Sequence, residues 1–327
     1  MTLKLVYSPL YTYTNHGINY FLAESATAND AGDEVSVTLR KNVLWSDGSP
    51  FNADDVLFTF GKKTNLADER FVDSLLVFGD KAVQTEKVND YTVLFRFPQA
   101  VANPYETLAG IFIAPVHIYK DVDDLEHTEL NKTPVGTGPY TLTEYVAGQH
   151  LLFTANEKYM FGKPKIEKIV YKIVGNQDTT ILALKKGELD LLGISPDQIE
   201  DVAQNKDLTI TTYPQSNVIY LKLNQWSEKF ADQDVREAVF YSLDRDEIMK
   251  SHFKDAAYYH FTDSFLPADS KWINHNLKNY QRDVKKAQAL LEAAGKNKLA
   301  LKLGYNIKNG MQAKMALVIQ QQLQEAG

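Results

Sequence analysis

The sequence has 327 residues, a length that predicts roughly two domains at about 150 residues each. Its composition is 44% hydrophobic and 24% charged, which is ordinary for a globular protein, and its net charge of -7 comes without a long Lys/Arg run, so a nucleic-acid surface is not expected. The absence of cysteine excludes disulfides, thiolate nucleophiles and zinc–thiolate sites, and no stretch reaches the ~18 apolar residues of a membrane helix.

Residues 35–60 predict a strand, a turn and a capped helix in succession. Hydrophobic and polar residues alternate from Val35 to Arg40, which is the period of a half-buried strand. The Asp-Gly and Pro of WSDGSP are typical of a turn. Asn52 can then cap a helix whose first turn holds Asp54 and Asp55, where negative charge is favourable.

The residue pattern of this stretch, LRKNVLWSDGSPFNADDV, resembles the signature of the family 5 solute-binding proteins of ABC importers. That group binds oligopeptides, dipeptides and nickel. Its signature is a strand ending in Leu-Arg, then an aromatic residue, Asp-Gly, Pro and a Thr/Asn-Ala-Asp/Glu-Asp-Val helix start. Within it we expect Trp45 to pin the turn onto the sheet and Asp47-Gly48 to be structural. Tyr20–Ser25 resembles the family segment that leads into the strand.

The next elements complete one predicted unit. Tyr91–Phe97 alternates again and predicts a strand that pairs with residues 35–40, ending at Pro98. Asn103-Pro104 is typical of an N-cap followed by proline at the first helical position. We therefore interpret residues 1–133 as the extra α+β domain of the family.

Pro134–Tyr140, PVGTGPY, resembles the G-(T/S)-G-P-Y segment at which the family chain returns to its main domain. Residues 140–146 and 149–155 predict a hairpin around Ala147-Gly148, and residues 166–174 predict a further strand.

From Asp178 onward short strands and helices are predicted to alternate. Asp178 is predicted to cap a helix that Gly187 ends, and Ser195-Pro196 to begin another. This spacing indicates α/β units with a partly parallel sheet, so residues 134–255 are interpreted as part of the main α/β lobe. Strands are predicted at 189–191, 208–213 and 218–223.

A second resemblance to the family begins at DVREA and LDRDEI. Asp244 and Glu247 there have the spacing of a capping box. Residues 283–294 and 311–326 predict amphipathic helices, and 299–303 predict a strand. Residues 256–327 are interpreted as the start of a second lobe. The resemblance implies a class II periplasmic-binding-protein fold (Venus-flytrap), mixed α/β and α+β, with an incomplete second lobe and truncation at both ends.

The sequence favours binding over catalysis. Gly136-Thr137-Gly138 lacks the third glycine of a dinucleotide loop, because Thr141 stands there. His252 and His260 are the nearest approach to a metal pair, but a surface or packing role is the favoured interpretation, so no metal and no cofactor are expected. The carboxylate pairs that a hydrolase would need across a cleft are better explained as helix caps and solvated faces; they are Asp54–Asp55, Asp123–Asp124 and Asp232–Asp234.

The resemblance places the ligand site on residues 213–226, YPQSNVIYLKLNQW. By that resemblance Gln215, Ser216 and Asn217 are predicted to make polar contacts with a peptide backbone. A core position is disfavoured for Gln215 and Asn217, because burying unpaired amides is costly. Tyr220 and Trp226 either wall a side-chain pocket or belong to a buried strand. Phe78 aligns loosely with an aromatic residue that touches ligand in peptide-binding relatives.

The family implies a substrate-binding component of an ABC importer, not an enzyme, which delivers a peptide-like solute to permease subunits. It implies an extracytoplasmic location, with the signal segment and any lipid anchor upstream of this sequence. The alternatives are a nickel- or metal-chelate-binding or other solute-binding protein, a non-transport receptor or adhesion module, or a carboxylate hydrolase. Many ligand contacts in the family come from beyond this sequence, so we expect this chain alone to bind ligand weakly or not at all.

Overall fold

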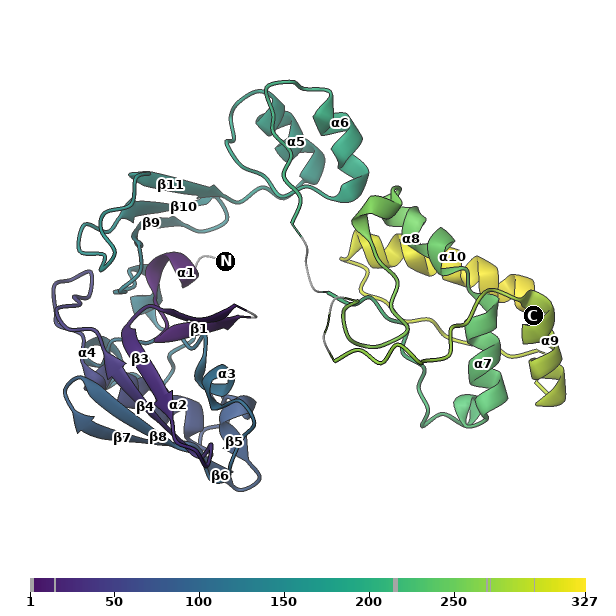
Figure 1. Cartoon of the computed structure of the whole chain (residues 1–327). Helices are drawn as coiled ribbons and strands as arrows, with labels where there is room; N and C mark the ends of the chain where they lie inside the picture. The colour runs from purple at the N-terminus through teal and green to yellow at the C-terminus, as the bar shows by residue number, and fades with distance from the viewer. Residues whose placement is uncertain (1–2, 15, 214–216, 269, 271, 297) are drawn as a thin grey trace. The chain divides into compact units, whose positions relative to one another are not determined.

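A computed structural model describes residues 3–14, 16–213, 217–268, 270, 272–296 and 298–327 (Figure 1). The chain divides into two compact units, Met1–Gly175 and Asn176–Gly327, each with its own apolar clusters. Within the described ranges, the helices all fall short of the length and apolar character that crossing a membrane requires.

Antiparallel strands dominate the first unit. They form a four-stranded sheet in the order β3-β4-β8-β7, a three-stranded sheet in the order β11-β10-β9, and the hairpins β1-β2 and β5-β6. The strands are β1 (Tyr11–Thr14), β2 (Gly17–Tyr20), β3 (Ala23–Ala28), β4 (Glu34–Leu39), β5 (Val77–Phe78), β6 (Lys81–Ala82), β7 (Gln84–Asn89), β8 (Thr92–Arg96), β9 (Tyr140–Val146), β10 (His150–Ala155) and β11 (Lys168–Lys172). The helical elements are α1 (Leu3–Val6), α2 (Ala53–Thr64), η1 (Ser74–Leu76), α3 (Pro104–Leu108), α4 (Val116–Tyr119) and η2 (Glu129–Lys132).

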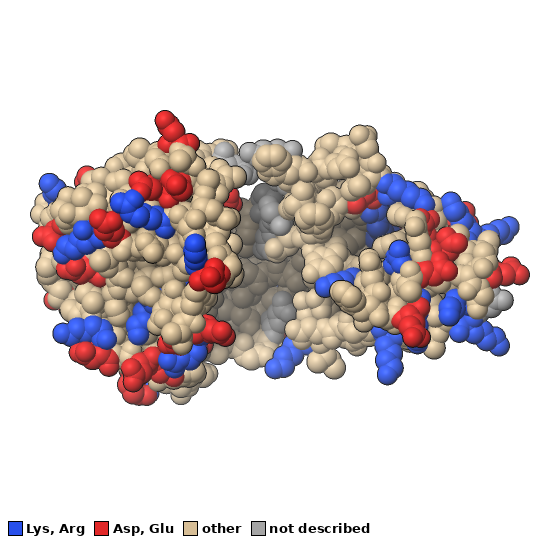
Figure 2. Space-filling model, turned by 90° about the horizontal axis from the view of Figure 1, so that it is seen from below, with Lys and Arg blue, Asp and Glu red and all other residues tan. Residues whose placement is uncertain are grey.

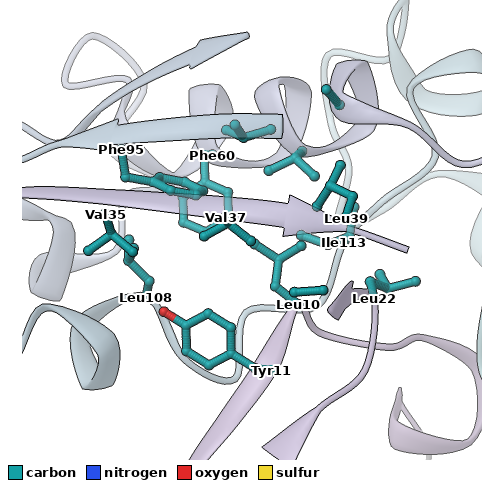
Figure 3. Packing of buried hydrophobic residues seen from close by; sticks show 14 of the residues in the cluster. Leu10, Tyr11, Leu22, Val35, Val37, Leu39, Phe60, Phe95, Leu108 and Ile113 are labelled. Atoms are coloured by element: carbon teal, nitrogen blue, oxygen red, sulfur yellow. The ribbon is translucent and has the colours of Figure 1, made fainter. Parts of the chain in front are cut away.

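The core of the first unit lies between the four-stranded sheet and α2. The alternate residues Val35, Val37 and Leu39 of β4 are fully buried, and Figure 3 shows them beside Phe60 of α2 and Phe95 of β8. The Phe60 and Phe95 rings meet edge to face with centroids 4.6 Å apart. The predicted pairing of residues 91–97 with 35–40 is confirmed, with Val37 opposite Val93. The predicted hairpin of β9 and β10 and the Asn103 cap of α3 are confirmed as well.

The predicted packing role of Trp45 is confirmed, because its side chain is fully buried and its ring meets Phe51 edge to face. Its Nε1 donates a 3.3 Å hydrogen bond to Oδ2 of Asp55, which is only 2% exposed. Asp55 Oδ2 also accepts from the Asn52 amide at 3.1 Å, and Oδ1 accepts from the Val116 amide at 2.9 Å. One buried carboxylate therefore joins the turn, the start of α2 and the start of α4.

The turn after β4 also contacts the GTGPY segment. The Ser46 amide donates to the Gly136 carbonyl at 2.9 Å, and the Gly138 amide donates to the Val6 carbonyl at 2.7 Å. The backbone of α1 lies directly on these glycines, so that a Cβ added at Gly136 would stand 1.8 Å from the carbonyl oxygen of Val6. The glycines are required here because no side chain fits under α1.

Surface charges of the first unit are paired across neighbouring elements. Lys87 of β7 lies 2.9 Å from Asp54 at the start of α2, and Arg96 of β8 contacts Glu34 of β4. Figure 2 shows acidic and basic side chains interspersed on the face it displays. Exposed pairs of this kind contribute little to stability, about 0–1 kcal/mol each, so the fold rests on the buried contacts.

Helices dominate the second unit. They are α5 (Gln177–Lys185), η3 (Pro196–Gln198), α6 (Ile199–Ala203), η4 (Glu228–Phe230), α7 (Gln233–Ser242), α8 (Arg245–Phe253), η5 (Ala256–Tyr258), α9 (Val284–Ala293) and α10 (Gly310–Ala326). α7 packs against α9, and α10 packs against α8 (Figure 1). The two predicted amphipathic helices are confirmed as α9 and α10.

The strands predicted in the second unit are not formed in its described residues. Residues 189–191, 208–213, 218–223 and 299–303 are assigned to no strand, so the partly parallel sheet predicted from their spacing is wrong for this chain. Leu221, Leu223 and Leu301 instead pack against the cluster formed by α7, α8 and α10. The alternating hydrophobicity gives these leucines a common apolar side, and that side packs against the helices. A strand needs in addition a neighbouring strand for its backbone hydrogen bonds.

Two predicted caps differ in detail. The N-cap of α5 is Asn176, whose Oδ1 accepts from the amides of Asp178 and Thr179, so Asp178 lies in the first turn and is not the cap. Asp244 caps α8 by accepting from the Glu247 amide at 3.0 Å. The reciprocal bond of the predicted box is supplied by Gln322 of α10, whose Oε1 accepts from the Asp244 amide at 2.9 Å.

Gln322 connects two helices and is only 1% exposed. Its Nε2 donates to Oε2 of Glu247 at 2.7 Å, so the oxygen and the nitrogen of the Gln322 amide both bond to residues at the start of α8. The sequence spacing found the cap but not this partner, because Gln322 is distant in sequence and nothing local marks it.

The close approach of α1 to the GTGPY segment predicts that Gly136→Ala lowers the free energy of unfolding by about 1–3 kcal/mol or more, because the added Cβ overlaps the Val6 carbonyl. The matched control is Gly61→Ala in α2, where a Cβ meets nothing within 4 Å. That change should raise stability by about 0.5–1 kcal/mol. Urea unfolding followed by far-UV circular dichroism measures both. Equal effects would show that α1 does not pack on Gly136.

The hydrogen bonds of Asp55 predict that Asp55→Asn destabilises the first unit by about 1–3 kcal/mol, because an amide NH2 cannot accept from the donors it would face. Asp54→Asn is the control, since Asp54 is exposed and its ion pair with Lys87 is worth less than about 1 kcal/mol. Thermal unfolding of the two variants measures the difference. A loss in Asp54→Asn as large as in Asp55→Asn would contradict this account.

The buried amide of Gln322 predicts that Gln322→Ala costs about 1–3 kcal/mol, because it leaves the Asp244 amide without its acceptor. Gln321→Ala, one position earlier and exposed, should change stability by less than about 0.5 kcal/mol. Guanidinium unfolding followed by circular dichroism compares them. If both variants unfold at the wild-type midpoint, the bridge between α10 and α8 is not stabilising.

Candidate functional site

The residues predicted to bind ligand fall on two separate parts of the chain. Gln215 and Ser216 lie outside the described residues. Asn217 is exposed, Tyr220 is 73% exposed and Trp226 is 98% exposed, all in the second unit. Phe78 belongs to the first unit.

Two leucines hold the segment 217–226 on the helices of the second unit. Leu221 and Leu223 are half-buried and pack with the cluster that includes Val239 and Met315. Tyr220 and Lys222, at the alternate positions, are exposed. Exposed and half-buried positions thus alternate from Tyr220 to Leu223. The segment is therefore anchored along one side and presents the other side to solvent.

A turn at the end of the segment fixes the position of Trp226. The Trp226 amide donates to Oδ1 of Asn224 at 3.2 Å, and the Ser227 amide donates to the Asn224 carbonyl at 3.1 Å. An Asn side chain that hydrogen-bonds the backbone two residues later is a common turn device. The sequence interpretation did not single out Asn224, although an Asn two residues before an aromatic residue was the available signal.

Phe78 is a partly buried residue of β5. Its ring lies edge to face with Phe97, with centroids 6.2 Å apart, and it packs against the core of the first unit. These contacts are those of a packing residue that keeps part of its ring accessible. The structure thus groups Asn217, Tyr220 and Trp226 on one segment and places Phe78 in the other unit.

Residues 217–223 are assigned to no strand, and Tyr220 and Trp226 expose aromatic surface to solvent. Extended peptides are often recognised by main-chain pairing, with specificity from pockets for alternate side chains. Tyr and Trp combine an apolar body with a polar tip, which suits walls around such pockets.

The acid pairs have structural partners, as interpreted from the sequence. Asp232 caps α7 by accepting from the Asp234 amide at 2.8 Å, and Asp124 Oδ1 accepts from the Glu126 amide at 3.0 Å. The Asp55 carboxylate accepts hydrogen bonds from Trp45 Nε1 and from the amides of Asn52 and Val116. Burial raises the pKa of the Asp55 carboxyl, against the opposing effect of those hydrogen bonds.

Several histidines are held by carboxylates. His117 Nε2 lies 2.8 Å from Asp47 Oδ2, which ties α4 to the signature turn. Partial burial alone would raise the pKa of the Asp47 carboxyl, but hydrogen bonds from Ser49 and His117 outweigh it and keep that pKa below its ordinary value. His260 is exposed, and the parts of the chain that the structure describes contain no group of three or more metal-ligating side chains.

Comparison with known proteins gives the following relatives. Oligopeptide-binding protein AppA of Bacillus subtilis is 29% identical over 99% of this chain and 62% of its own length. The nickel-binding periplasmic protein of Escherichia coli is 29% identical over 89% of this chain and 56% of its own length. The solved structure of the ABC transporter substrate binding protein CtaP from Listeria monocytogenes superposes with a TM-score of 0.85, at 29% identity, over 99% of this chain and 66% of that one.

The chain therefore spans less than two thirds of the length of these relatives. The expected fold is confirmed by the superposition, since the solved relative is a solute-binding protein of mixed α/β structure. The family model of bacterial extracellular solute-binding proteins, family 5, matches residues 17–327. This match includes both stretches that resembled the family by sequence. The chain belongs to the family 5 bacterial extracellular solute-binding proteins.

Proposed function

We propose that this protein is the substrate-binding component of an ABC importer and that its solute is peptide-like. One observation carries the proposal: residues 217–226 present two exposed aromatic side chains, Tyr220 and Trp226, on a segment that Leu221 and Leu223 anchor to the helices. The name of the relative AppA, an oligopeptide-binding protein, supports the same ligand class. No covalent step is part of this function, so the protein acts as a carrier and not as an enzyme.

In this proposal the peptide backbone pairs with the main chain of residues 217–223 and supplies affinity, while Tyr220 and Trp226 contact the side chains of the peptide. Ligand stabilises a closed arrangement of two lobes through its differential affinity for that arrangement. Gln215, Ser216 and Asn217 supply amide and hydroxyl contacts, and Phe78 is a separate candidate for an aromatic contact. The closed, loaded form is recognised by permease subunits at an extracytoplasmic membrane surface.

The domain boundaries that we propose follow the family resemblance. Residues 1–133 form the extra α+β domain, 134–255 belong to the main lobe and 256–327 begin the second lobe. A metal chelate is the second candidate ligand, because the nickel-binding periplasmic protein is as similar in sequence as AppA over the matched region.

Photo-crosslinking tests the ligand class, because it detects weak binding. A pool of short peptides that carry a benzophenone side chain is irradiated with the protein, and the adducts are mapped by mass spectrometry. We expect adducts within residues 217–226, reduced by unlabelled peptide and not by nickel–histidine. Adducts lost only to the nickel chelate would favour the second candidate. Peptide cleavage would indicate an enzyme, and an absence of adducts on this segment would refute the proposed site.

Trp226→Ala should lower the yield of these adducts severalfold, because aromatic anchors dominate binding surfaces of this kind. Tyr145→Ala is the control, since Tyr145 is 44% exposed on β9 in the first unit and is not part of the proposed site. Intact-mass spectrometry measures the yield. Equal losses in the two variants would show that crosslinking follows exposed aromatic surface and not the segment.

A further inference from the structure

An ion pair joins two parts of the second unit that are distant in sequence. Asp197 lies in η3, immediately before α6, and its Oδ2 lies 2.5 Å from Nζ of Lys314 in α10. Ser195 Oγ donates to the other carboxylate oxygen, Oδ1, at 2.5 Å. η3 also packs against α8, which carries His252. We call the four residues Ser195, Asp197, His252 and Lys314 the junction.

The junction attaches a small helical block to the remaining helices. The block comprises α5, η3 and α6, and Lys185 of α5 pairs with Asp201 of α6 at 2.7 Å. The chain leaves the block after residue 205 and continues into the segment that contains Asn217, Tyr220 and Trp226. Contacts at the junction therefore constrain the block relative to α8 and α10.

His252 is the unusual member of the junction. Its Nδ1 is buried and has no hydrogen-bond partner among the described residues. A buried polar atom without a partner is uncommon and costs free energy. In the neutral imidazole, Nδ1 can be the unprotonated nitrogen, so only a lone pair lacks a partner there. In the imidazolium, Nδ1 carries a proton, which would place an unpaired N–H and a positive charge in the same position.

Three elements pack against α8, the helix that carries His252: η3, η5 and α10. Burial lowers the pKa of His252, the charge of Asp197 opposes this and the charge of Lys314 adds to it. Asp197 is already engaged by Lys314 and Ser195. The remaining ionised groups nearby have partners of their own: Asp246 with Lys250, Glu247 with Gln322, and Asp255 of η5 with the Ala257 amide.

We propose that His252 makes the junction a pH-sensitive latch, closed while the imidazole is neutral and loosened when it is protonated. Protonation puts an unsatisfied N–H into the buried position and a cation beside Lys314. Because Lys314 already neutralises Asp197, no free anion in the described part of the junction compensates the new charge. The block of α5, η3 and α6 then separates more readily from α8 and α10. This inference does not rest on the proposed function.

The direction and the range of the effect follow from the two titrating groups. A histidine whose pKa is lower in the folded state than in the unfolded chain contributes stability above about pH 6.5, and that stability is lost as the pH falls toward the lowered value. Burial alone would raise the pKa of Asp197, but Lys314 and Ser195 hold it at about 2. Asp197 therefore stays ionised between pH 7.5 and 5, and His252 accounts for the change there.

Hydrogen exchange of the 327-residue chain, measured by mass spectrometry at pH 7.5 and pH 5.0 and corrected for intrinsic exchange rates, tests the latch. We expect amides in peptides covering 195–204 to lose protection severalfold at pH 5.0, while α2 of the first unit keeps its protection and serves as the internal reference. Equal protection of 195–204 at the two pH values would overturn the proposal.

Two variants assign the effect to His252. His252→Phe retains an aromatic ring that cannot be protonated, and it should abolish the difference between the two pH values; His252→Gln serves the same purpose if the larger ring disturbs folding. His260→Phe, at an exposed histidine in the same unit, should keep the difference. Lys314→Met removes the ion pair and should lower protection at both pH values. A full pH dependence in both His252 variants, or undiminished protection in Lys314→Met, contradicts the latch.

Discussion

The buried carboxylate of Asp55 is the constraint on which the first unit depends. A carboxylate that is 2% exposed is stable only when its oxygens accept enough hydrogen bonds to replace water. Trp45, the Asn52 amide and the Val116 amide meet that need from a turn, a helix cap and a second helix. These three segments must therefore come together, and the sequence motif WSDGSPFNADD describes this requirement in local form.

The second unit depends on a different kind of contact. Its helices are joined by apolar clusters and by buried or half-buried polar bridges that cross from one helix to another, such as Gln322 and the pair Asp197–Lys314. These bridges fix the helices, and the helices in turn hold Leu221 and Leu223. The exposed side of the segment 217–226 is thus a consequence of helix packing on its other side.

Local patterns predicted the elements whose causes are local. The strand at Val35, the cap at Asn52 and the helices α9 and α10 follow from alternation, capping chemistry and helical periodicity within a few residues. The strand expected at 218–223 had the right alternation, yet alternation specifies only which side is apolar. Whether the apolar side meets a sheet or a layer of helices, and whether the backbone finds a partner, depends on residues far away in sequence. The same limit hid Gln322 as the partner of the Asp244 amide.

The candidate site shows where resemblance and geometry supply different information. Resemblance selected the stretch 213–226, but it could not state that Tyr220 and Trp226 are exposed while Leu221 and Leu223 are anchored. The exposed fractions contradict the interpretation as part of a buried strand, because a side chain that is 98% exposed gains little from its own fold. The role as walls of a side-chain pocket stays a prediction. The turn at Asn224 fixes the backbone at Trp226 and leaves the side chain in solvent, so its apolar surface gains free energy only when a partner covers it. This exposure is an argument for binding that sequence alone could not make.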